Sequence, residues 1–424
     1  MAYSAPTTYS ALTPETVTGH LATLSAVADL LGGDPAQWTA EEVGDGNLNL
    51  VFIVRSGAQS VVAKQALPYV RLVGESWPLP LSRAYFEHEA LVREESAAPG
   101  LTPSVIHYDH EMALIVMEHL TPHIILRKGL IAGQIYPKLA EHAGHFMAHT
   151  LFSYSDLALD GETKKLNVAL FSENHVMCAL TEQVIFDDPY FEAELNRHTN
   201  PQLDAVAADI RADSALKIGI QELKTLFMAK TETLIHGDLH SGSIMVTEDD
   251  TRVIDPEFAF YGPMGFDIGA LQANLLLAYF SQEGHETTPG ERDAYREWIL
   301  SVMLDVWSVF EREFTKLWRT QRAGSLYPKT LFAEDDTASS ERALTRYLDG
   351  VLCDSIGFSG AKMLRRILGI AHVEDMEAIE GADLRAKCEK KALALARMLI
   401  ADRAQIAGFG EIARMARAIE EGSQ

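Results

Sequence analysis

Hydrophobic and polar positions divide this chain into a strand-like first part and a helical remainder. Between about residues 40 and 118, short apolar runs alternate with turn-forming residues, a pattern typical of strands, and one helix interrupts them. From about residue 123, apolar residues recur every three or four positions, which predicts amphipathic helices. The segments with this spacing are 134–152, 291–318, 341–371 and 384–401, and polar connections are predicted at 287–290 and 323–340.

This pattern indicates an α+β fold with two lobes. A helical extension is expected over residues 1–38, a small β-rich lobe over 39–120, and a larger, mostly helical lobe over 121–424. The helix over 341–371 is expected to break near Gly357 and Gly360, because glycine lowers the stability of a helix interior.

Acidic residues follow two neighbouring apolar runs in the helical part. The motifs are His236-Gly237-Asp238-Leu239-His240 and Asp255-Pro256-Glu257. Kinase-like folds use one carboxylate in a loop, followed by further acidic residues after the next strand, for phosphoryl transfer to a hydroxyl. Asp238 is placed to accept the proton of that hydroxyl. Asp255 and Glu257, two residues apart in an extended segment, are expected to point to the same side and to bind Mg²⁺.

A glycine-containing turn near the start of the β-rich lobe predicts a site for phosphates. The segment Gly44-Asp45-Gly46-Asn47-Leu48-Asn49 lies between two likely strands. Gly44 and Gly46 would let backbone amides approach phosphate oxygens, and Asn47 or Asn49 could cap the turn or contact the phosphates.

A lysine on the following strand strengthens the prediction of a nucleotide site. Val61-Val62-Ala63-Lys64 resembles the kinase strand whose lysine reaches the first phosphates and pairs with a helix glutamate. Glu87 is the favoured partner, since it stands four residues before Leu91 on one helix face, and Glu89 is the alternative.

The end of a later apolar strand is the expected connection between the lobes. Leu114 to Met117 is apolar and runs into Glu118, His119, Leu120 and a proline. Backbone groups at such a strand end can pair with adenine. The sequence therefore predicts a protein-kinase-like two-lobe fold that binds ATP between the lobes.

Seven stretches, in order from about residue 40 to about 375, resemble the methylthioribose kinase family. The segment with Trp77 and the Asp-Pro-Glu motif are the most specific, because choline kinases and aminoglycoside phosphotransferases typically have Asp-x-Asp at that motif and lack the tryptophan segment. The stretches are Gly44-Asp45-Gly46-Asn47-Leu48-Asn49, Lys64-Gln65-Ala66-Leu67-Pro68-Tyr69, Gly74-Glu75-Ser76-Trp77-Pro78-Leu79, Arg127-Lys128-Gly129-Leu130-Ile131, His236-Gly237-Asp238-Leu239-His240, Asp255-Pro256-Glu257-Phe258-Ala259-Phe260-Tyr261-Gly262-Pro263 and Arg365-Arg366-Ile367-Leu368-Gly369-Ile370-Ala371-His372.

The resemblance implies ATP- and Mg²⁺-dependent phosphorylation of the C1 hydroxyl of 5-methylthioribose, a step of methionine salvage, by a homodimer. It also implies that Trp77 lies on a loop over the active site, that Pro256 lies with the metal pair at the ATP site, and that Arg365 and Arg366 contact the sugar. Without the resemblance, both arginines would read as helix-surface residues paired with Glu374 or Asp375.

Two further polar positions near the acidic motifs can be interpreted. Ser243 stands where protein kinases place a metal-binding asparagine, so Glu257 is the alternative source of that oxygen. Asp267, at the start of an apolar helix, is expected to cap that helix or to hold the loop of Asp238 through its backbone.

The amino-acid composition bears on the binding partners of this protein and on its location in the cell. The chain has 36 Lys and Arg against 60 Asp and Glu, a net charge of −24, which argues against nucleic acid and anionic membranes as partners. Its three cysteines have no metal-binding spacing, and they predict free thiols in a reducing compartment. The first 13 residues lack the basic and apolar regions of a leader, and no apolar stretch is long enough to span a bilayer, so a cytoplasmic location is expected.

Two alternatives to a methylthioribose kinase remain open at this point. One is a kinase of the same fold for another small hydroxylated molecule, such as choline, homoserine, a sugar or an aminoglycoside. The other is a non-catalytic nucleotide-binding module, which would be expected to have lost Lys64, Asp238 or Asp255; all three are present.

Overall fold

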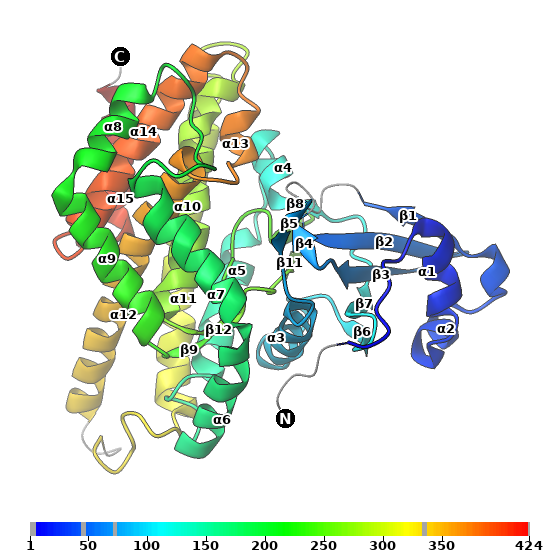
Figure 1. Ribbon diagram of the computed structural model, residues 1–424. Helices are drawn as coiled ribbons and strands as arrows, with labels where there is room; N and C mark the ends of the chain where they lie inside the picture. Colours follow the sequence, from blue (N-terminus) through cyan, green and yellow to red (C-terminus); the bar gives the residue numbers. More distant parts are fainter. Residues whose placement is uncertain (1–5, 44–47, 71–73, 333–336, 423–424) are drawn as a thin grey trace.

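The computed structural model has the two lobes that the sequence predicts (Figure 1). It describes residues 6–43, 48–70, 74–332 and 337–422, with the side chains of 74–76 excluded. A β-sheet lobe lies on one side of Figure 1 and a mostly helical lobe on the other, with helix α3 between them. The predicted glycine turn, with Gly44, Gly46 and Asn47, lies outside the described residues.

The smaller lobe is built on a five-stranded antiparallel sheet in the order β1-β2-β3-β7-β6. Strand β3 is central, and its Lys64 is paired in register with Val51 of β2 and Ile115 of β7. A separate hairpin joins β4 to β5. The strands are β1 Thr39–Glu42, β2 Asn49–Ser56, β3 Gln59–Ala66, β4 Tyr69–Val70, β5 Gly74–Pro78, β6 Val105–Asp109 and β7 Leu114–Glu118.

Alternating residues send side chains to the two faces of this sheet, and helices cover both faces. Phe52, Val54 and Val116 join a core with the N-terminal helices α1 (Pro14–Leu21) and α2 (Ser25–Leu31). On the opposite face, Ile115 and Met117 pack with Leu91 of helix α3, which spans Arg83–Ala97. The sheet is thus buried on both sides, and α3 is fixed beside Lys64.

The larger lobe consists of helices around one extended apolar core. Helix α10 is its centre, because all 18 of its residues are buried. The helices are α4 Leu126–Ile131, α5 Leu139–Ser153, α6 Gly161–Phe171, α7 His175–Thr181, α8 Asp204–Ala212, α9 Ser214–Ala229, α10 Met264–Ser281, α11 Asp293–Gln321, α12 Thr337–Leu368, α13 Glu374–Glu377, α14 Ala382–Ala401 and α15 Phe409–Glu421.

Short strands complete this lobe and flank the acidic motifs. One small sheet, ordered β11-β10-β8, includes the strand that follows the connection between the lobes, and another, ordered β12-β9, lies within the helical lobe (Figure 1). Their strands are β8 Ile124–Ile125, β9 Thr233–Ile235, β10 Ile244–Val246, β11 Thr251–Val253 and β12 Phe260–Gly262. Short helical turns lie at Pro35–Gln37, Ser172–Asn174, Glu182–Asp187, Asp188–Tyr190 and Gln282–His285.

The predicted break near Gly357 and Gly360 is wrong, because α12 runs unbroken through both glycines. A Cβ at position 360 would lie 2.6 Å from the Ala396 carbonyl oxygen of α14, so glycine here permits close helix packing. Other boundaries shift by a few residues. The helix predicted from 134 begins at Leu139, the connection predicted up to 340 gives way to helix from Thr337, and α11 extends to Gln321.

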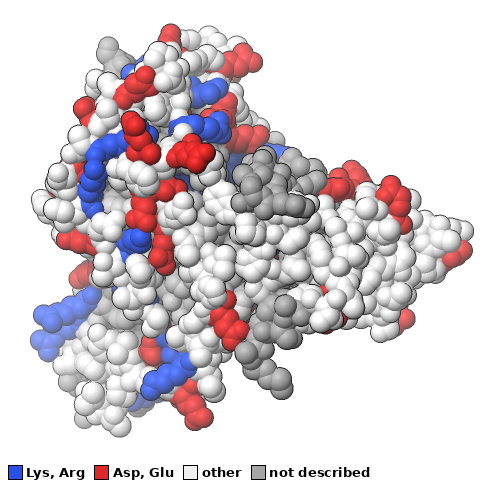
Figure 2. All heavy atoms as spheres, in the orientation of Figure 1, with Lys and Arg blue, Asp and Glu red and all other residues white. Residues whose placement is uncertain are grey.

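The described charged residues are not spread evenly. On the face in Figure 2, Lys and Arg are interspersed with Asp and Glu over the helical lobe, while those of the sheet lobe are mainly acidic. Among the described residues, no helix combines the length and the apolar character that crossing a bilayer requires.

We expect Gly360→Ala to lower the free energy of unfolding by about 1–3 kcal/mol, because the added methyl group would push α12 away from the α14 backbone. Gly350→Ala, on an exposed stretch of the same helix with open space around it, should instead stabilise the protein by about 0.5–1 kcal/mol. Urea unfolding of the two variants tests this, and equal midpoints would contradict the packing role of Gly360.

Candidate active site

The loop that carries Asp238 is held by its backbone. It follows strand β9, and both oxygens of the Asp267 carboxylate accept hydrogen bonds from it: 2.7 Å from the His236 backbone N–H and 3.0 Å from that of Gly237. Gly237 has a φ of 83°, and a Cβ there would lie 2.2 Å from the Phe258 carbonyl oxygen. Of the two roles expected for Asp267, holding this loop is therefore the observed one.

His236 links the loop of Asp238 to that of Asp255. Its Nε2 donates to the Ile254 carbonyl oxygen at 2.9 Å, and its Nδ1 accepts the Asp238 backbone N–H at 3.3 Å. Ser243 closes the same loop, because its hydroxyl donates to the Asp238 carbonyl oxygen at 2.9 Å. The Ser243 side chain is thus engaged within the loop itself.

The Asp238 carboxylate lies between a lysine and a histidine. Lys362 Nζ, from α12, is 3.1 Å from Oδ1, and His240 Nε2 is 3.2 Å from Oδ2. His240 Nδ1 accepts the Gly242 backbone N–H at 3.0 Å, so the ring proton is on Nε2 and points at Asp238.

Neutral and charged neighbours together keep Asp238 ionised. Burial by itself would raise the pKa of Asp238, but His240 and Lys362 hold it well below its usual range. Burial lowers the pKa of His240 to about 3, so that ring is a neutral hydrogen-bond donor. Lys362 therefore supplies the positive charge that stabilises the ionised Asp238 carboxylate. Its own pKa is lowered by burial to about 8, and it remains mainly protonated at pH 7.

A second charged cluster lies where the sheet lobe meets the helical lobe. Lys64 Nζ is 2.7 Å from Glu87 Oε1 of α3 and also contacts Asp255 Oδ1. The alternative partner, Glu89, pairs with Arg93 instead. Burial by itself would lower the pKa of Lys64, but Asp255 and Glu87 raise it above its usual value.

The Glu257 carboxylate belongs to the same cluster. Its Oε2 accepts hydrogen bonds from Arg83 Nε at 3.1 Å and from Asn49 Nδ2 at 3.3 Å. Glu87, Asp255 and Glu257 each offer an oxygen within 4.8 Å of the others. Burial, and then the neighbouring Asp255 carboxylate, raise the pKa of Glu257.

The carboxylates of Asp255 and Glu257 lie close together, but the backbone conformation that brings them together is not the predicted one. Asp255 is not extended but has a left-handed backbone with a φ of 72°, and no strand includes the motif. Pro256 is buried between the two acids. The Asn174 side chain donates to the Glu257 and Ala259 carbonyl oxygens, both at 3.0 Å, and so fixes the turn. The expectation of an extended segment was wrong, although the carboxylates do meet.

Arginines gather on the other side of Asp238. Arg365 and Arg366 end helix α12, and both donate to the Ala371 carbonyl oxygen, at 3.4 and 2.9 Å. The Nε of each is buried without a hydrogen-bond partner among the described residues. Asp375 lies 3.3 Å from Arg127 Nε, so the surface pairing of Arg365 or Arg366 with Asp375 is not what the structure has.

The remaining predicted residues lie on strands β5 and β7 and in the segment that follows β7. Glu118 ends β7, His119 Nδ1 is 2.9 Å from the Ser60 hydroxyl, and Leu120 is buried in the connection that follows. Trp77 lies on β5, half-buried, and is not among the described partners of Asp238 or Asp255.

Lys362 and Arg83 were not predicted from the sequence. Both lie in helices, where a lone cation is usually a solvated surface residue, yet Arg83 is fully buried and Lys362 is 4% exposed. A weak signal existed for Lys362, which stands among apolar and small residues three positions before Arg365.

Comparison with known proteins identifies the family of this chain. Residues 39–303 match the model of the phosphotransferase enzyme family. Methylthioribose kinase 1 of Oryza sativa subsp. japonica is 50% identical over 91% of this chain and 90% of its own length. The chain belongs to the methylthioribose kinase family. Another member, the methylthioribose kinase of Escherichia coli O45:K1 (strain S88 / ExPEC), is 45% identical over 98% of this chain and 100% of its own length.

A solved structure of a glucosamine kinase covers 84% of this chain and 85% of its own, with 14% identity and a TM-score of 0.44. As a member of the methylthioribose kinase family, the protein is an enzyme that transfers a phosphoryl group, with ATP as co-substrate.

We expect Lys362→Met to move the acid limb of the pH profile of kcat/KM upward by about one to two pH units. Without the cation, burial raises the pKa of Asp238, which is then protonated at pH values where the parent has it ionised. The control is Lys230→Met, which removes a similar lysine 2.8 Å from Asp354. An unchanged acid limb in Lys362→Met would contradict this role.

Proposed function

We propose that this protein transfers the γ-phosphoryl group of ATP to the C1 hydroxyl of 5-methylthioribose, a step of methionine salvage. The relatives named above are kinases of methylthioribose at 45–50% identity over nearly the whole chain, which supports the proposal.

The positive charge around Asp238 is the observation that carries the choice of acceptor. Lys362 contacts this carboxylate directly, and Arg366 is near enough to lower its pKa. Choline and aminoglycosides are cations, and they would be repelled there. Methylthioribose is neutral, and its hydroxyl oxygens can accept the hydrogen bonds that Arg365 and Arg366 have left to donate.

In the proposed mechanism Asp238 is the general base. The C1 oxygen attacks the γ-phosphorus, the bond from that phosphorus to the β-γ bridging oxygen breaks, and the hydroxyl proton passes to Asp238 as ADP leaves. His240 and Lys362 hold the carboxylate in place from both sides. Because its pKa is held low, Asp238 is ionised and ready to accept the proton at neutral pH.

We assign the cluster around Lys64 to the nucleotide. Lys64, fixed by Glu87, would contact the phosphates of ATP, and Asn49 lies next to the acidic pair. The backbone from Glu118 to Leu120 would pair with adenine, and Gly44, Gly46 and Asn47 would complete the phosphate site.

The carboxylates fit a hard divalent cation. Asp255 and Glu257 would hold Mg²⁺, since they and Glu87 bring three carboxylate groups together against the cations of Lys64 and Arg83. When bound, Mg²⁺ neutralises charge on the phosphates. The pKa of Glu257 is raised first by burial and then by the negative charge of Asp255, which a bound cation would offset.

Three features of the proposal rest on the family resemblance and on composition. Trp77 would lie over the bound sugar, and the protein would act as a homodimer. A cytoplasmic location is in keeping with three free cysteines.

A coupled assay of ADP release tests the function with methylthioribose, ribose, choline and an aminoglycoside as acceptors. Turnover should be greatest with methylthioribose and should stop when Mg²⁺ is chelated. Asp238→Asn, which keeps the shape and removes the base, should lower kcat by about two to four decades with little change in ATP affinity. Turnover confined to choline or to the aminoglycoside would refute the proposal, and an active Asp238→Asn variant would refute the role of Asp238.

Arg365→Ala and Arg366→Ala should each lower kcat/KM for methylthioribose by the equivalent of about 1.5–3 kcal/mol, the scale of a charged hydrogen bond. Calorimetry should find the affinity for ATP with Mg²⁺ nearly unchanged. Arg346→Ala, at an exposed position of the same helix, is the control. If the variants lost affinity for ATP and kept an unchanged KM for the sugar, the two arginines would have to be assigned to the nucleotide and not to the sugar.

A further inference from the structure

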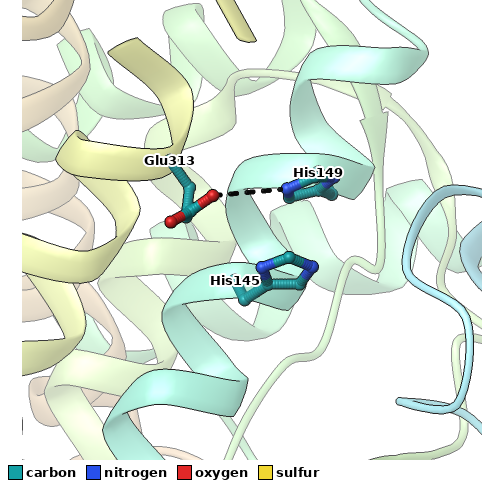
Figure 3. A group of neighbouring side chains, drawn as sticks. All are labelled: His145, His149 and Glu313. Carbon is teal, nitrogen blue, oxygen red and sulfur yellow. Dashed lines mark ion pairs between the residues drawn. The ribbon is translucent and has the colours of Figure 1, made fainter. Parts of the chain in front are cut away.

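A group of metal-binding side chains lies outside the active site, between helices α5 and α11. His145 and His149 stand one turn apart on the same face of α5, and Glu313 comes from α11. Figure 3 shows the Glu313 carboxylate directed at the His149 ring, with the His145 ring one turn away along α5. None of these residues is among the partners described above for Asp238 or Asp255.

We propose that His145, His149 and Glu313 form a site for a divalent transition metal of the zinc class. Each residue can offer one ligand atom, and these atoms all lie within 4.8 Å of one another. Two imidazoles and a carboxylate are a ligand set that Zn²⁺ prefers, whereas Mg²⁺ prefers oxygen ligands alone. Three protein ligands would leave one position of a tetrahedral ion for water.

The geometry of the two histidine rings and their hydrogen bonding are the second observation that supports a metal site. The imidazole rings are stacked, with centroids 3.9 Å apart and planes inclined by 22°. His149 Nε2 is buried and has no hydrogen-bond partner among the described residues, and the Glu313 carboxylate oxygen is 3.7 Å away, beyond hydrogen-bonding distance. A buried ring nitrogen without a hydrogen-bond partner costs free energy, and a metal ion between it and the carboxylate would give that nitrogen a partner.

The backbone around the site is firmly packed. A Cβ at Gly144 would lie 2.6 Å from Val309 of α11, and Phe152 packs edge-on against Phe314 at 5.4 Å. The two helices therefore hold the three side chains at a nearly fixed separation, and small side-chain rotations suffice to bring the ligand atoms together.

Two cations compete with a metal for Glu313. Arg312 Nε is 3.1 Å from one carboxylate oxygen, and Lys316 Nζ is 3.8 Å from the other. Both side chains are more than half exposed, so either can turn into solvent when the carboxylate binds a metal. A bound ion would cross-link α5 to α11, and α5 in turn supports strand β9 through a hydrogen bond from the Thr233 hydroxyl to the Leu151 carbonyl oxygen. We infer a stabilising role and not a catalytic one.

Zinc titration of the full-length protein without a histidine tag tests the site, with millimolar Mg²⁺ present to occupy the all-carboxylate cluster. The parent should bind one Zn²⁺ that His149→Ala and Glu313→Gln bind at least about tenfold more weakly. Zn²⁺ should raise the Tm of the parent by a few degrees and should leave the Tm of both variants unchanged. His142→Ala, on the same helix but outside the cluster, is the matched control and should bind as the parent does.

Removing Lys316, which competes with a metal for Glu313, gives a test in which zinc affinity should rise. Lys316→Met should tighten zinc binding, because it frees the Glu313 carboxylate without touching a ligand. Phosphoryl transfer by the His149→Ala and Glu313→Gln variants should stay near the parental rate. Zinc binding of equal strength in the parent, His149→Ala and Glu313→Gln would overturn the proposal, as would the absence of saturable binding to the parent.

Discussion

The crowding of three carboxylates, two of them buried, is the constraint on which the layout of this candidate active site depends. Glu87, Asp255 and Glu257 come from both lobes and bring their carboxylates within a few ångströms of one another. Lys64 and Arg83 offset only part of that charge. Since a buried unpaired carboxylate is costly, this region favours additional cations and disfavours anions that arrive without them. This surplus of negative charge supports the proposed binding of the nucleotide together with Mg²⁺.

The opposite arrangement surrounds Asp238. There one carboxylate faces Lys362 and, farther away, Arg365 and Arg366. The site therefore has an acidic side and a basic side, with the phosphoryl group expected to pass between them. Such a division is what the proposed mechanism requires, in which one carboxylate acts as a base at neutral pH and others of the same chemical type nearby hold a cation.

The site residues that could be predicted from the sequence are those that stand at recurring positions in sequence motifs. Lys64 on a strand, Glu87 on a helix and Asp238 in a loop follow recurring patterns, and the structure brings the first two together. Arg83 and Lys362 could not be predicted, because a cation in a helix carries no local sign that tertiary packing will bury it. The same limit explains α12. Its glycines signal a break when only the helix is considered, and they signal close contact once α14 is present.

Helix α3 connects the two lobes through its packing. One of its faces packs on the sheet through Leu91, and another packs through Phe86 and Ala90 against Leu234 and Tyr261, which belong to the helical lobe. The helix is therefore packed against both lobes at once. Since Glu87 lies on this helix, contacts with the sheet lobe and with the helical lobe together fix the position of its ion pair with Lys64.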